Sequence, residues 1–81
     1  MKLAAGKFYV SRNGLVWCCF KVDPRAEEHT YAHCIRIYDS RIEYFFQDGR
    51  YERKGTDEHT LVRRLMINGE AKTPDSDPAK G

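Results

Sequence analysis

The dipeptide Asn13-Gly14 constrains the fold of this chain more than any other short stretch. Asn-Gly is the strongest local signal for a two-residue type I′ turn, because both central residues of that turn need positive φ. The flanking residues are mostly aromatic, β-branched or otherwise compatible with strands, so residues 7–22 predict a β-hairpin. A loop of these two residues would place Val10 opposite Trp17 on one face and leave Tyr9 on the other face. We expect Trp17 to be buried in the core.

Later turn signals extend this hairpin into a meander. Asp23-Pro24 ends the second strand, because proline cannot donate a hydrogen bond to a ladder. Residues 29–38 and 41–47 predict two further strands, joined by Asp39-Ser40. Asp48-Gly49 then predicts a turn into a short fifth strand. The sequence therefore predicts about five antiparallel strands.

The alternation of residues in the fourth predicted strand indicates which side chains face the core. Ile42, Tyr44 and Phe46 form an apolar stripe on one face when the loop before them has two residues. Phe45 alternates onto the other face, which it shares with Arg36. We therefore expect Tyr44 to be buried and Phe45 to be exposed.

A short helix is predicted after the strands. Thr56 or Asp57 is a suitable N-cap, and apolar residues follow at helical spacing until Asn68-Gly69 ends the pattern. The apolar face of this helix consists of Leu61, Val62, Leu65 and Met66. Residues 1–69 are thus expected to form one α+β domain, an antiparallel meander of about five strands that could close into a small open barrel, with one short C-terminal helix. Residues 70–81 contain two prolines and no apolar residue larger than alanine, which predicts a disordered tail.

The composition excludes several classes of protein. The chain is 41% hydrophobic and 32% charged, which is too apolar for a disordered protein and too charged for a membrane protein. The longest apolar run, residues 15–20, is far shorter than the roughly 20 residues of a membrane-spanning helix. The N-terminal sequence lacks the apolar region of a signal peptide, so we expect a cytoplasmic protein without membrane contact. The net charge of +2 is small for a dedicated nucleic-acid binder.

The cysteines and histidines do not follow the spacing of a metal or catalytic site. Cys18 and Cys19 are adjacent, so in a strand they point to opposite faces and cannot share one ion. No pair of cysteines has the C-x2–4-C spacing of structural zinc. We expect these two thiols and Cys34 to be free, buried, small apolar side chains. No phosphate loop, oxyanion loop or pair of carboxylates accompanies them, so we expect neither an enzyme nor a cofactor.

The function that remains is binding of another macromolecule. One helix cannot cover both faces of the sheet, so the face opposite the core is expected to expose aromatic side chains, Phe20 among them, and basic side chains. This is the composition of a protein interface. The candidate binding residues are Tyr9, Arg36, Tyr38, Phe45, Arg50 and Arg53. This face could bind a host protein or a second copy of the chain. The alternative is a small β-rich domain that binds single-stranded nucleic acid or a signalling nucleotide, since such domains stack bases on exposed aromatic rings beside basic groups.

Three short motifs carry a resemblance to a group of proteins. Residues 8–14 (FYVSRNG), 48–51 (DGRY) and 56–62 (TDEHTLV) resemble motifs of small phage- and prophage-encoded proteins of unknown function. The resemblance covers roughly residues 7–65. The chain departs from it at His59-Thr60, where those proteins have an acidic residue before the leucine, and at Trp17-Cys18-Cys19. It implies an accessory protein of phage origin that acts in the host cytoplasm, for example as an inhibitor of a host defence complex.

Overall fold

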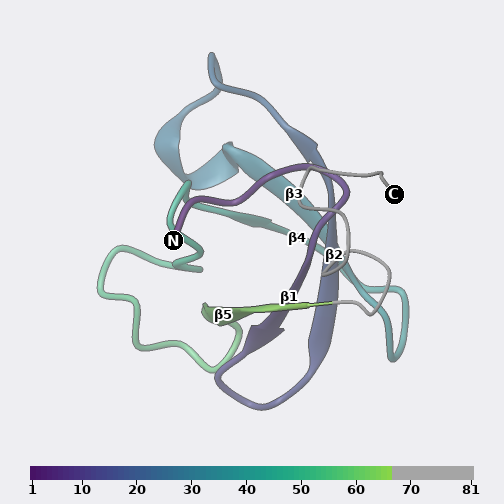
Figure 1. The fold of residues 1–81 in the computed structure, drawn as a ribbon. Coiled ribbons are helices and arrows are strands. Elements are labelled where there is room, and N and C mark those ends of the chain that lie inside the picture. Colours follow the sequence, from purple (N-terminus) through teal and green to yellow (C-terminus); the bar gives the residue numbers. More distant parts are fainter. Residues whose placement is uncertain (67–81) are drawn as a thin grey trace.

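The computed structural model describes residues 1–66 as an open sheet of five antiparallel strands (Figure 1). The strands are β1 (Phe8–Ser11), β2 (Val16–Val22), β3 (Ala32–Arg36), β4 (Ile42–Phe45) and β5 (Leu61–Leu65). Their spatial order is β4-β3-β2-β1-β5, so a four-stranded meander receives β5 at its β1 edge. A single turn of 3-10 helix, η1 (Glu28–Thr30), precedes β3. The predicted meander of antiparallel strands is confirmed.

The prediction of a helix was wrong for residues 61–65, which form β5. This strand pairs with β1, with Phe8 opposite Leu65 and Tyr9 opposite Arg64. The free edge of β1 offers main-chain donors and acceptors along its length, whereas an isolated helix this short is unstable in water. Pairing with β1 therefore decides the conformation of this segment.

The segment after β4 also differs from the prediction. The residues after Asp48-Gly49 form a series of turns that links β4 to β5, so the short strand predicted there is absent (Figure 1). The turn itself is present, because Gly49 N donates to Phe46 O at 3.0 Å. The predicted helix end at Asn68-Gly69 and the predicted tail at residues 70–81 lie outside the described residues.

The first hairpin has a three-residue loop, which shifts its register by one residue from the prediction. Ser11 N donates to Leu15 O at 2.9 Å, so residues 12–14 form the loop. Gly14 has φ of +84° whereas Asn13 does not have positive φ, which fits a type I turn followed by a left-handed residue and excludes type I′. Tyr9 consequently pairs with Trp17 and lies on the same face of the sheet.

The second hairpin has a four-residue loop in place of the predicted two-residue loop. Arg36 N donates to Arg41 O at 2.7 Å, and Ile35 pairs with Ile42. The two strands still divide their side chains between the faces as predicted, but the buried face is the opposite one. Tyr44 is half exposed and Phe45 is fully buried.

The core lies on one face of the sheet and contains side chains from all five strands. Its buried members are Leu3, Tyr9, Trp17, Cys19, Ala32, Cys34, Phe45 and Leu61. The N-terminal segment joins this core because Leu3 N donates to Gln47 O at 2.8 Å, and Leu61 N donates to Gly49 O at the same distance. Trp17, predicted to be buried, is fully enclosed, and its Nε1 donates to Ser11 Oγ at 3.2 Å.

Candidate functional site

Four large apolar side chains lie on the outer face of the sheet, opposite the core. Phe20 of β2, Ile37 after β3, and Ile42 and Tyr44 of β4 expose between 47% and 53% of their surface. We refer to these four residues as the outer apolar patch. Monomeric proteins rarely expose many large apolar side chains together, so this patch is the candidate interaction site.

Cross-strand pairs make the patch continuous. Tyr44 pairs with His33 across β3 and β4, and the centroids of their rings are 4.7 Å apart. The ring of Phe20 also contacts His33, in a T-shaped arrangement with the ring centroids 6.2 Å apart. Three rings therefore form a row across β2, β3 and β4, beside the Ile35–Ile42 pair. This row is fixed by the sheet, so a partner would meet a surface that is already ordered.

Sequence reasoning placed Ile42 and Tyr44 in the core and so missed most of this patch. The two faces of the second hairpin are almost equally apolar, and alternation identifies the two sets of side chains without showing which set is buried. Phe20 was expected on the exposed face, and it lies there. The contacts of the Phe20 and Tyr44 rings with His33 cross from strand to strand. They leave no pattern in the sequence from which the rest of the patch could have been predicted.

Two of the candidate binding residues are not on the surface, and the prediction that they are exposed was wrong. Phe45 is fully buried between Trp17 and Tyr51, with ring centroids 5.2 Å and 5.7 Å away. Tyr9 is also buried, and its hydroxyl accepts a hydrogen bond from Ala4 N at 2.9 Å. Burial raises the pKa of the Tyr9 hydroxyl. The one-residue shift of the first hairpin moves Tyr9 inward, and the inverted face of the second moves Phe45 inward.

Arg36 and Tyr38 lie near the second hairpin but do not form a common site. Only 12% of the Arg36 side chain is exposed, and its guanidinium donates two hydrogen bonds to Asp39, at 2.9 Å and 2.7 Å. These bonds lower the pKa of Asp39 to about 2. The guanidinium also lies 5.4 Å from the ring of Trp17. Arg36 therefore closes one end of the core, whereas Tyr38 is 82% exposed in the loop.

Arg50 and Arg53 come together over one aromatic ring. Their guanidinium carbons lie 4.7 Å and 6.0 Å from the centroid of Phe46. Each arginine also has an acidic partner, since Arg50 pairs with Asp48 at 2.9 Å and Arg53 pairs with Glu28 at 3.6 Å. Phe46 is almost fully buried, as predicted, although Ile42 and Tyr44, which the alternation grouped with it, are half exposed. The Phe46 ring therefore cannot stack on a base. The basic charge expected for nucleic-acid binding is balanced here by carboxylates.

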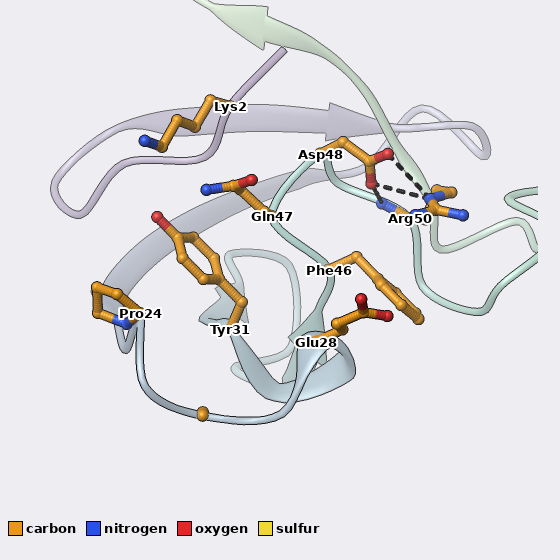
Figure 2. Close-up of a pocket in the computed structure, with 9 residues that line it drawn as sticks. Lys2, Pro24, Glu28, Tyr31, Phe46, Gln47, Asp48 and Arg50 are labelled. Atoms are coloured by element: carbon orange, nitrogen blue, oxygen red, sulfur yellow. Dashed lines mark hydrogen bonds and ion pairs between the residues drawn. The ribbon is translucent and has the colours of Figure 1, made fainter.

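A shallow cavity of about 380 Å³ lies beside these arginines (Figure 2). Figure 2 shows Tyr31 and Phe46 on its walls, with the Asp48–Arg50 ion pair at one end. Its lining also includes Lys2 and Glu28, so the charges of both signs alternate around it. The volume reaches the lower range of small-molecule pockets, but the mixed charge does not indicate one class of ligand.

A polar cluster at the rim of the core was not predicted from the sequence. His59 Nδ1 lies 2.8 Å from Asp57 Oδ1, and the imidazole stacks on Tyr51 with ring centroids 4.9 Å apart. The Tyr51 hydroxyl donates to Glu43 Oε1 at 3.0 Å, and Glu43 in turn pairs with Arg41. Burial and the neighbouring Glu43 carboxylate raise the pKa of Tyr51. These groups satisfy one another, so the cluster braces the link between β4 and β5.

The cysteines occupy both faces of the sheet. Cys19 and Cys34 are buried and free, as predicted, whereas Cys18 is free but only partly buried. Within residues 1–66, no three His, Cys, Asp or Glu side chains gather in a way that could hold a metal ion. The same part of the chain contains no helix of the length and apolarity needed to cross a membrane.

Comparisons with known proteins do not assign this chain to a family. No family model matches the chain, and neither a curated protein nor a solved structure matches it.

Proposed function

We propose that this chain is a non-enzymatic domain that binds a partner protein through the outer apolar patch. The observation that carries this proposal is the half-exposed state of four large apolar side chains on one continuous sheet face. Protein interfaces are enriched in aromatic side chains at their centres, and ordered aromatic anchors supply most of the binding energy. The row formed by Phe20, His33 and Tyr44 provides such anchors.

The proposed partner is a host protein in the cytoplasm. The resemblance of three short motifs to phage-encoded proteins supports this choice, and occupation of a component of a host defence complex would be the corresponding role. The patch replaces the aromatic and basic face expected from the sequence, because Phe45 and Tyr9 are buried and the arginines carry acidic partners. Binding by apolar contact would depend only weakly on salt, whereas binding to phosphates falls steeply with salt.

The proposal is tested first by capture and then by measurement on a purified pair. The full chain is used to capture partners from host lysate, with and without nuclease, and the captured protein is then titrated by calorimetry. Tyr44→Ser removes one ring of the row without opening the core, so we expect at least a tenfold loss of affinity. Arg53→Glu is the matched control, because Arg53 is exposed and lies outside the patch, and we expect it to change affinity by less than about threefold.

Two results would contradict the proposal. One is loss of binding in Arg53→Glu with a steep salt dependence and no effect of Tyr44→Ser, which would indicate recognition of nucleic acid through charge. The other is a purified chain that sediments as a dimer and becomes monomeric with Tyr44→Ser. That result would show that the patch binds a second copy of the chain, and no surface would then be assigned to a host protein.

A further inference from the structure

Two thiols face each other across β2 and β3 on the core side of the sheet. Cys19 and Cys34 are Cα partners in the ladder, and both are fully buried and free. The third cysteine, Cys18, pairs with Ile35 instead. Successive residues of a strand point to opposite faces, so Cys18 lies on the outer face and cannot reach Cys34 through the sheet.

The main-chain hydrogen bonds show which kind of cross-strand pair this is. Cys19 N donates to Lys7 O at 2.9 Å, and Cys19 O accepts from Gly6 N at 2.7 Å. Both main-chain groups of Cys19 therefore point away from β3, which makes Cys19 and Cys34 a non-hydrogen-bonded pair. The Cα atoms of such a pair are about 4.5 Å apart and their side chains approach closely. This separation falls within the range that a disulfide bond spans, roughly 4.4–6.8 Å.

The two thiols also differ in acidity. The hydrogen bond from Cys34 lowers the pKa of Cys19, although burial opposes this effect. The same hydrogen bond, together with burial, raises the pKa of Cys34. Cys19 is therefore the thiol that loses its proton first, and the thiolate is the form of cysteine that attacks an oxidant.

We propose that Cys19 and Cys34 form a modification site, a dithiol that a peroxide oxidises to a cross-strand disulfide between β2 and β3. The Cys19 thiolate attacks one oxygen of hydrogen peroxide, the O–O bond breaks, and hydroxide leaves as Cys19 becomes a sulfenic acid. The sulfur of Cys34 then attacks the Cys19 sulfur, the S–S bond forms, and the S–O bond breaks with release of water. The two thiols lose two electrons, and one peroxide is reduced to two molecules of water. This site is independent of the proposed protein-binding function.

The test treats the full native chain with hydrogen peroxide and then alkylates it in denaturant without reductant. Of the three cysteines in the chain, we expect only Cys18 to be alkylated, in a product that remains a monomer and has lost two hydrogens. Trypsin separates the partners, because it releases Cys18 and Cys19 in residues 13–21 and Cys34 in residues 26–36. These two peptides should be joined by a bond that a reductant cleaves.

The variant Cys18→Ser distinguishes the proposed bond from its alternative. This side chain is on the outer face and only partly buried, so the substitution leaves the core intact. We expect the variant to form the same linked peptides and to retain no alkylated cysteine. Loss of the link in Cys18→Ser would show that Cys18 is the true partner, and the proposal would then fail. It would also fail if Cys19 and Cys34 of the folded variant were both alkylated, or both converted to sulfinic acids without a link.

Discussion

Replacement of Phe45 by alanine provides a direct test of which sheet face is buried. Phe45 is fully enclosed and contacts the rings of Trp17 and Tyr51. Truncation of a buried phenylalanine costs about 3–5 kcal/mol, from lost burial and from the cavity left behind. A domain of this length has a free energy of unfolding of roughly 4–12 kcal/mol, so Phe45→Ala removes a large part of it and could unfold the chain.

Tyr44→Ala is the matched comparison, because this ring is the neighbour of Phe45 in the same strand but lies half exposed on the outer face. We expect its stability to stay within about 1 kcal/mol of the wild type. Phe45→Leu provides a milder core variant that should still fold, with a loss of about 1–2 kcal/mol.

Urea denaturation followed by the fluorescence of Trp17, the single tryptophan, measures all three variants. With a slope of about 1 kcal/mol per molar urea, Phe45→Leu should lower the midpoint by about 1–2 M, and Tyr44→Ala by less than about 1 M. The reasoning is refuted if Tyr44→Ala unfolds the domain while both substitutions of Phe45 leave the midpoint unchanged.

Three further predictions concern single contacts in the fold. Ser11→Ala removes the acceptor of Trp17 Nε1 inside the core and should cost about 1–3 kcal/mol in the same urea assay; an unchanged midpoint would show that this hydrogen bond is dispensable. Gly49→Ala would place a Cβ atom 2.8 Å from a main-chain oxygen at the start of β5, at φ of +98°, so its melting temperature should fall well below that of the wild type. The pKa of Asp39 is depressed in the folded state by its hydrogen bonds from Arg36, so its contribution to stability is present above the unfolded value of 3.8 and is lost as pH falls towards about 2. Melting temperatures of Asp39→Asn should therefore depend less on pH across that interval than those of the wild type, and parallel curves would contradict the assignment.

The sequence by itself determined the antiparallel meander but not the α+β class, because residues 61–65 of the predicted helix form a strand. The turn dipeptides Asn13-Gly14, Asp39-Ser40 and Asp48-Gly49 all lie in turns or loops, and the residues before and between them form β1 to β4 in the predicted order. Turn chemistry and strand propensity act over a few neighbouring residues, so they can be read from a single sequence. Trp17 and Phe46 were predicted to lie in the core, and both are buried.

The tertiary structure decided the register, the buried face and the conformation of residues 61–65. One additional loop residue in the first hairpin moved Tyr9 from the outer face into the core, and no local signal separates a three-residue loop from a two-residue loop when Gly14 serves both. Leu61 belongs to a strand because the free edge of β1 can pair with it. This pairing joins segments about fifty residues apart in the sequence. The candidate site depends on which face of the sheet is buried. Leu3 and Leu61 join the core on the face that carries Phe45, so Phe45 is enclosed and Tyr44 faces solvent.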